Sequence, residues 1–423
     1  MKILLSKKCK RILVYLATLL LSLLFIVIGN RYVSRNAVYF ENEASTPQRG
    51  KVMEILERRV SDSSVGTEGS VTEDVTLIFS VRLESGPDKG ITVRAAQYTD
   101  PYYAVKIKEV EVGDRILIYP MENESLNLYW SFSEYVRTDA LLVLGVVFCL
   151  FLFLFGRSKG IHTLISLVFT CLAVFMVFLP SVLNGLNIYF WSILVCIFII
   201  VMTLLIINGA DSKSLVAGIG CISGVLTAGL LTLIMDHFLK LTGLLDDESM
   251  YLYFLNTEYP INLKAIIFAA IIIGAVGAIM DVAISLASSL LEIREHAKHP
   301  SLRLLIHSGF TIGRDMMGTM ANTLILAYIG SSLSVVLLLT AYNNSLLALL
   351  NKEMIVVEIL QALVGSFGIL LTIPLTTIVG AIIYTRRPHE ACPPPALKPA
   401  EIPTENAAGF AQGASQKNSS CAD

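Results

Sequence analysis

Long apolar runs dominate the chain from Ala140 to Tyr384. They hold about 18 residues or more, the length that a helix needs to cross about 30 Å of hydrocarbon, and short polar breaks separate them. Another apolar run covers residues 12–28. The pattern predicts eight membrane-spanning helices, at residues 12–29, 139–156, 161–180, 189–207, 214–236, 262–285, 316–341 and 355–384.

The region between the first two predicted helices is polar and has a different periodicity. From Val75 to Leu83, apolar residues alternate with polar ones, as they do in a half-buried strand. Residues 50–60, 90–98, 105–112 and 114–119 are predicted as further strands, with turn-forming residues between them. We therefore expect a small antiparallel barrel or sandwich.

The predicted fold class is an α-helical polytopic membrane protein with one small all-β domain inserted between helices 1 and 2. Its parts are a basic start with a signal-anchor helix (1–29), an extracytoplasmic β domain (30–138), a seven-helix bundle (139–387) and a disordered cytoplasmic tail (388–423). The first apolar run is longer than that of an ordinary signal peptide, and no small-residue cleavage site follows it. An uncleaved anchor is therefore expected.

Lysine and arginine residues predict the orientation, because they gather on the cytoplasmic side of membrane proteins. The basic start and the basic breaks between alternate spans fall on one side, so we expect both termini in the cytoplasm. The basic residues on that side are Arg157, Lys159, Lys213, Arg294, Lys298, Arg303, Arg314, Arg386 and Arg387. Tyr129, Trp130, Phe132 and Tyr135 precede the second span and are predicted to lie at the outer membrane interface.

Composition excludes several classes of function. Hydrophobic residues make up 54% of the chain and charged residues 16%, with a net charge of −2, and no basic patch could follow a nucleic acid backbone. No Walker A sequence, Rossmann fingerprint or nucleophile elbow occurs, so we predict no enzyme, no catalytic residue and no cofactor. Glu292, His296 and His299 would share a helix face, but their spacing fits no zinc motif and no metal site is predicted.

Polar residues inside the later spans are the natural candidates for function, because charged groups in a membrane are costly. Asp281 and Ser285 share one face of the sixth span, and Asp315, Thr319 and Asn322 share one face of the seventh. We expect the two faces to meet, with Asp281 and Asn322 at similar depth. Arg314 either anchors the inner boundary or neutralises a carboxylate. The candidate intramembrane polar site is Asp281, Ser285, Arg314, Asp315, Thr319 and Asn322.

Small residues at intervals of three or four let helix backbones approach closely. Gly274, Gly277, Gly318, Gly365 and Gly368 are predicted to serve helix packing in this way. The small and polar stripe of the eighth span suits either the wall of a cavity or a tight helix crossing.

Two stretches resemble a known family. Residues 274–281 (Gly-Ala-Val-Gly-Ala-Ile-Met-Asp) and residues 313–330, which begin Gly-Arg-Asp-Met-Met-Gly-Thr-Met-Ala-Asn, resemble the YibE/F family of bacterial multi-pass membrane proteins. The similarity extends loosely over residues 140–384. The resemblance implies a bacterial cell membrane protein without an assigned activity, and it draws attention to the signature positions Asp281, Arg314, Asp315, Gly318 and Asn322.

Two functions fit these observations. The first is a permease or secondary transporter of unassigned substrate, linked to a cation or proton through Asp281. The alternative is a membrane scaffold or sensor whose outer β domain binds a ligand, an envelope component or a partner protein. The expected partners are the lipid bilayer, a small ion or solute, and either a second membrane protein or another copy of the chain.

Overall fold

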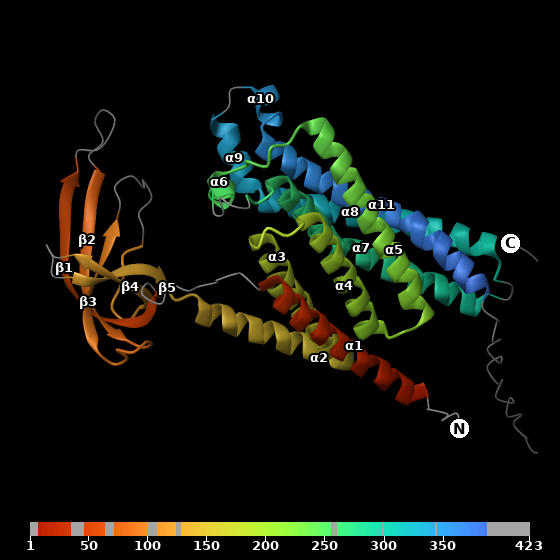
Figure 1. The fold of residues 1–423 in the computed structure, drawn as a ribbon, viewed down its shortest axis with the longest axis horizontal. Coiled ribbons are helices and arrows are strands. Elements are labelled where there is room, and N and C mark those ends of the chain that lie inside the picture. The colour runs from red at the N-terminus through yellow and green to blue at the C-terminus, as the bar shows by residue number, and fades with distance from the viewer. Residues whose placement is uncertain are drawn as a thin grey trace, which may run out of the picture.

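The computed structural model describes residues 7–34, 46–63, 72–99, 108–123, 128–254, 260–297, 300–342 and 345–386. It has two parts, a small domain of strands and a bundle of long helices (Figure 1). The strand domain lies between the first and second helices of the chain, where the alternation of apolar and polar residues predicts it.

Five strands close into a barrel. They pair in the order β1-β2-β3-β5-β4, and β4 pairs again with β1. All neighbours are antiparallel except β3 and β5, which run parallel. This strand order is that of the OB fold, a five-stranded Greek-key barrel. The strands are β1 (Gln48–Ser63), β2 (Thr72–Leu83), β3 (Thr92–Thr99), β4 (Arg115–Asn123) and β5 (Leu128–Tyr135).

The barrel core contains the apolar positions of the predicted alternation. Leu77, Phe79 and Val81 of β2 are at most 2% exposed and pack with Ile116 and Ile118 of β4. Each such side chain stabilises the fold by about 1.5–3 kcal/mol when it is fully buried. The period of two in β2 therefore places one face of this strand in the barrel core.

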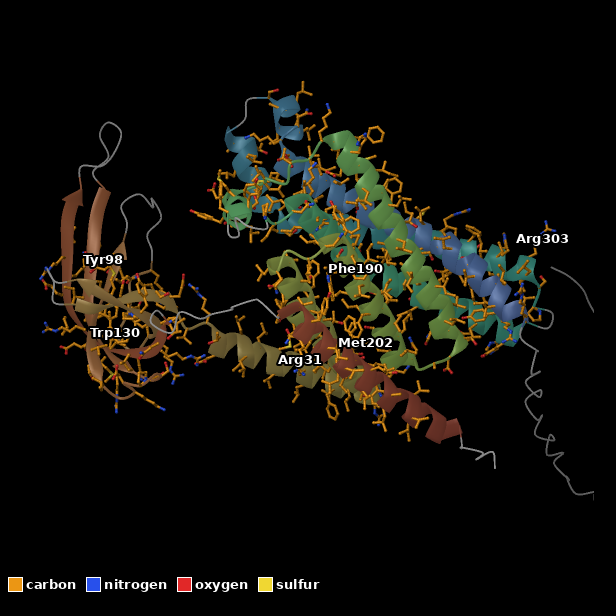
Figure 2. All side chains as sticks on the ribbon, viewed as in Figure 1. Arg31, Tyr98, Trp130, Phe190, Met202 and Arg303 are labelled. Carbon is orange, nitrogen blue, oxygen red and sulfur yellow. The ribbon has the colours of Figure 1, made fainter. Side chains whose placement is uncertain are left out.

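The predicted domain differs from the structure in two details. Trp130, Phe132 and Tyr135 belong to a strand that was not predicted, β5, and pack against the barrel core, where Figure 2 shows Trp130. Their place at a membrane interface stays a prediction. Within the predicted strand 105–112, residues 108–111 have no regular structure and a turn begins at residue 112, while 105–107 lie outside the described residues. The backbone N–H of Val110 donates to the side-chain Oε1 atom of Gln97 in β3, at 3.0 Å, and not to the backbone of a neighbouring strand.

Helices form the bundle. Figure 1 shows that α1 begins and α11 ends at one end of it, while the barrel, α6 and α9 lie toward the other end. The helical elements are α1 (Lys7–Val33), α2 (Thr138–Ala173) with a π-helical turn (Val174–Phe178), α3 (Leu179–Leu183), α4 (Ile188–Asn208), α5 (Ser212–Leu239), α6 (Asp247–Phe254), α7 (Leu263–His296), α8 (Leu302–Ser331), α9 (Leu333–Tyr342), α10 (Leu346–Leu350) and α11 (Glu353–Arg386).

Six helices in the described part of the chain are long and apolar enough to cross a membrane, and a seventh crossing is added if α8 and α9 form one span. These two helices meet at an angle of 58°. The stretch from Thr138 to Leu183 counts once, although its 46 residues would measure about 69 Å as one straight helix. That length is more than twice the hydrocarbon thickness of a bilayer.

A sharp turn at Arg157 divides this long stretch. Arg157 has φ 48° and ψ −128°, and these dihedral angles lie far from those of any regular helix. A Cβ atom on Gly160 would lie 2.1 Å from the carbonyl oxygen of Leu152, although residues eight apart in a straight helix are about 12 Å apart. The chain therefore doubles back, and residues 138–156 and 158–183 are each long enough for one crossing. The total of eight crossings stays a prediction.

The centre of the bundle is α7, which packs against α4, α5, α8 and α11. Its side chains Ile271, Ile272, Ile279 and Leu286 are fully buried. Most of the circumference of α7 is therefore covered by other helices.

Helices α5 and α11 cross very closely beside α7. A Cβ atom on Gly220 would lie 2.0 Å from Oγ1 of Thr376, and one on Gly224 would lie 2.0 Å from Oγ1 of Thr372. Both threonines are fully buried. At this position the small and polar stripe of α11 forms a tight helix crossing, and not the wall of a cavity.

Candidate functional site

The polar stripe of α7 lies on the outside of the bundle. Gly274, Gly277, Asp281 and Ser285 are exposed, whereas the large apolar side chains on the other faces of α7 are buried. A helix in contact with lipid has the reverse pattern, because apolar side chains face the hydrocarbon. This face of α7 is therefore unlike a lipid-facing surface.

The neighbouring helix α8 continues the polar face. Its inward side holds Gly313, where a Cβ atom would lie 2.2 Å from Ile373 of α11, so α8 packs closely on the bundle through its small residues. The predicted site residues of α8 point away from the bundle. The exposed residues of this group are Arg314, Asp315, Gly318, Thr319 and Asn322.

Two contacts indicate which residues of α7 and α8 lie at about the same depth. Near one end, a Cβ atom on Gly309 would lie 3.2 Å from Leu290, and near the other, one on Gly274 would lie 2.7 Å from the hydroxyl oxygen of Tyr328. Interpolation between these contacts along the antiparallel helices places Thr319 level with Asp281. Asn322 lies about one turn further toward α9.

The same interpolation places Asp315 level with Ser285. Arg314, Asp315 and Ser285 therefore lie together, closer to the end of the bundle at which α11 ends. The predicted site residues thus fall into two groups along the same outer face, one around Asp281 and the other around Ser285.

The charged groups on this face have no partner within the described part of the chain. Asp281, Arg314 and Asp315 form no ion pair and no hydrogen bond there, and the Asn322 amide forms none either. The hydroxyl of Thr319 donates to the carbonyl oxygen of Met316, at 3.0 Å. A carboxylate at the centre of a bilayer costs about 3 kcal/mol on insertion scales, so this face requires protein or water beside it.

The five glycines predicted for helix packing divide into two groups. A Cβ atom on Gly274, Gly365 or Gly368 would lie within 3 Å of a side chain on a neighbouring helix. Around Gly277 and Gly318, no described atom lies within 4 Å of the Cβ position. The first group lies in helix contacts, and the second faces open space on the polar face.

Two contacting residues escaped the reasoning from sequence. A Cβ atom on Gly274 would lie 2.7 Å from the hydroxyl oxygen of Tyr328 and 3.9 Å from Nε2 of Gln361, so α7, α8 and α11 meet at this point. The carboxylate of Glu353, in the first turn of α11, accepts hydrogen bonds of 2.6 Å from the backbone N–H groups of Thr242 and Gly243. No spacing rule could reveal Glu353, because its partners lie more than a hundred residues earlier in the chain.

Metal-binding residues do not gather anywhere in the described part of the chain, where no group of three or more His, Cys, Asp and Glu side chains could hold an ion. The Nδ1 atom of His296 lies 2.9 Å from the carbonyl oxygen of Glu292, within the last turn of α7. His299 lies outside the described residues.

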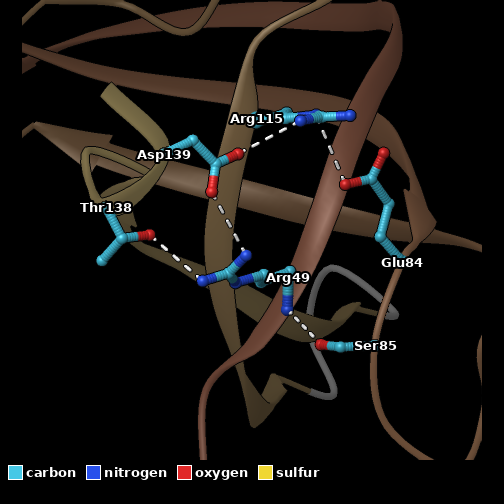
Figure 3. Close-up of polar contacts among 6 residues, drawn as sticks. All are labelled: Arg49, Glu84, Ser85, Arg115, Thr138 and Asp139. Carbon is cyan, nitrogen blue, oxygen red and sulfur yellow. Dashed lines mark hydrogen bonds and ion pairs between the residues drawn. The ribbon is translucent and has the colours of Figure 1, made fainter. Parts of the chain in front are cut away.

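A second polar group joins the barrel to the bundle (Figure 3). Asp139, in the first turn of α2, accepts from Arg115 of β4 at 3.1 Å and from Arg49 of β1 at 3.4 Å. Arg49 also donates to the hydroxyl of Thr138, at 3.1 Å, and Arg115 pairs with Glu84 at 3.5 Å. The arginines thus connect two barrel strands to the start of one helix.

Long apolar helices, an outer face of unpaired polar residues and a small barrel at one end define a class, that of helical proteins that span a membrane several times. A model of the YibE/F-like protein family matches residues 144–386, more than half of the chain, and the protein belongs to this family. The resemblance of residues 274–281 and 313–330 to that family is thereby confirmed. The match begins after the last barrel strand. No curated protein and no solved structure matches the sequence.

Proposed function

We propose that this protein is a permease that carries a small cation or polar solute across a bacterial cell membrane, along the polar face of α7 and α8. The observation that carries the proposal is the position of Asp281 and Thr319 at one depth, midway along α7, with Asn322 one turn away. Intramembrane carboxylates of secondary transporters hold the coupling ion or proton. Asp281 would bind the cation, while Thr319 and Asn322 would supply neutral oxygen ligands.

The broken α8–α9 pair supports the proposal. Discontinuous helices are common in secondary transporters, where the interrupted backbone presents carbonyl groups to the transported ion. Here the 58° bend follows Gly330, Ser331 and Ser332, and glycine and serine are frequent at sharp helix kinks.

We also propose that both termini are cytoplasmic. Arg294, Arg303 and Arg386 belong to the ends of α7, α8 and α11 that gather at one end of the bundle, where Figure 2 labels Arg303. Arginine and lysine favour the cytoplasmic side, so the barrel would lie outside.

Flux measurements on the purified protein in sealed vesicles test the transport proposal. A pH-sensitive dye inside the vesicles reports proton movement, and imposed sodium or potassium gradients test for a coupled cation. Asp281→Asn keeps the side-chain volume but removes the charge, so we expect flux to fall about tenfold or more. Glu295→Gln, at the exposed end of the same helix, is the matched control and should retain the full rate. Equal flux in the two variants would contradict the proposal.

A sensor is the second candidate, and the junction at Asp139 favours it. A ligand that bound the barrel would act on α2 through Arg49 and Arg115. Hydrogen exchange of residues 138–156 with and without soluble cell wall fragments tests this function. If the protein is a sensor, the fragments should change the exchange rate of these residues in the unmodified protein and leave it unchanged in Asp139→Asn. An exchange rate that the fragments leave unchanged in both proteins would contradict the sensor function.

A further inference from the structure

The outer face of α7 and α8 is open in a single chain. We call it the polar seam and define it by Gly277, Asp281, Arg314, Asp315 and Gly318. No described atom lies within 4 Å of the Cβ position of either glycine, and the three charged side chains are unpaired within the described residues. Glycines on a transmembrane surface let another helix backbone approach closely, and charged groups avoid lipid. The seam therefore has the composition of a helix interface whose second side is missing.

The charges of the seam are complementary to one another across a two-fold axis. Arg314 and Asp315 are consecutive in α8, so they differ in depth by about 1.5 Å and in direction by about 100° around the helix. A two-fold axis along the membrane normal places the same residues of a second copy at the same depth. Arg314 of each copy can then face Asp315 of the other, which forms two ion pairs at once.

We propose that two copies of this chain pair in parallel through the polar seam. The ion pairs between Arg314 and Asp315 close the seam on one side of Asp281, and Gly277 and Gly318 allow the helices to approach. The two Asp281 side chains then lie opposite each other, around a polar chamber that neither copy encloses alone. A second copy supplies the required charge pattern by symmetry, whereas an unrelated partner would need a separate complementary face.

The pairing is argued from the unpaired charges and the open glycines, and does not depend on transport. If the protein carries ions as a monomer, the pairing is overturned and the proposed function stands. If it is a dimer that carries nothing, the proposed function is overturned and the pairing stands.

Exchange of the seam charges tests the pairing. Full-length chains with two different affinity tags are expressed in the same cells, and co-purification of the second tag with the first measures the dimer. Arg314→Asp and Asp315→Arg, each expressed alone under both tags, place like charges opposite each other and should reduce co-purification about tenfold or more. When the Arg314→Asp chain is expressed with the Asp315→Arg chain, two acids face two arginines and the dimer should return.

The restored mixed pair also shows that each variant folds. Glu295→Arg, outside the seam, is the matched control and should leave co-purification unchanged. As an independent measurement, Gly318→Cys should give a disulfide-linked dimer when membranes are treated with a mild oxidant. Leu233→Cys, on the 46% exposed outer side of α5, should not.

The pairing is overturned if the unmodified chain is a monomer in lipid nanodiscs by single-molecule photobleaching. It is equally overturned if dimers form but ignore both charge reversals, because the contact then lies elsewhere. The pairing would also be refuted if a different protein covers the seam. In that case the thiol of Gly318→Cys is protected from labelling, but no second copy of the chain co-purifies.

Discussion

The crossing of α5 and α11 leaves no space for a methyl group, and Gly224→Ala tests this. The new Cβ atom would lie 2.0 Å from Oγ1 of Thr372, 3.1 Å from Ile279 and 3.3 Å from the carbonyl oxygen of Gly368. The threonine hydroxyl must move, which breaks its 2.7 Å hydrogen bond to that same carbonyl. Overpacking costs about 1–3 kcal/mol and the hydrogen bond about 1 kcal/mol, while alanine returns about 1 kcal/mol through its higher helix propensity. We expect a net loss of about 2 kcal/mol in the free energy of unfolding.

Unfolding by SDS in mixed micelles measures this loss. The chain has two tryptophans, one in the barrel and one, Trp191, in α4, so a Trp130→Phe background makes the fluorescence report on the bundle alone. Gly145→Ala is the control, because nothing lies within 4 Å of its Cβ position, and it should be neutral or slightly stabilising. Adding Thr372→Ala to Gly224→Ala removes the obstructing oxygen and should recover about 1 kcal/mol or more. Equal effects at the two glycines, or no recovery in the double variant, would refute the close crossing.

Three further predictions concern the barrel. Asp139→Asn should change the free energy of unfolding by less than about 1 kcal/mol, because its arginine partners are half-exposed, but should broaden the barrel-to-bundle distances seen by spin-label spectroscopy. Burial, followed by the charges of nearby carboxylates, raises the pKa of Tyr135, so the fold favours the neutral phenol. The stability that this residue contributes is present below about pH 10 and is lost as the pH rises through the folded pKa. The difference in tyrosinate absorbance between the unmodified protein and Tyr135→Phe measures this pKa. Gln97→Ala leaves the buried N–H of Val110 unpaired, which should lower the free energy of unfolding by about 1–3 kcal/mol. The hydrogen exchange of that amide should become faster, and an unchanged exchange rate would contradict this role of Gln97.

Regular periodicity made much of this fold predictable. The alternation around Phe79 places strand β2, and the long apolar runs coincide with the helices that could cross a membrane. Both signals are local, since each follows from the geometry of one strand or one helix and from what surrounds that element. The family resemblance also rested on local stretches of sequence.

Ambiguous or distant signals account for the errors. Strand β5 was missed because the aromatic residues around Trp130 are typical of a membrane interface, although a large amphipathic ring is also stabilised against a barrel core. The bend between α8 and α9 was missed although the run from Gly330 to Ser332 is typical of kinks. The stripe on α7 was expected to avoid lipid, and the structure places it on the exposed outer face of the bundle. Helical periodicity shows only that its residues share a face. It contains no information about which element covers that face.

The position of the barrel has a consequence for how the protein can be altered. It is inserted between α1 and α2, two helices in mutual contact, and it is bonded to the start of α2 by exposed polar groups around Asp139. Insertions at such exposed junctions are well tolerated in proteins, and the family match begins only beyond this one. The barrel can therefore be exchanged for another small domain by changing few contacts of the helical bundle, so that the two parts of the protein can be engineered separately.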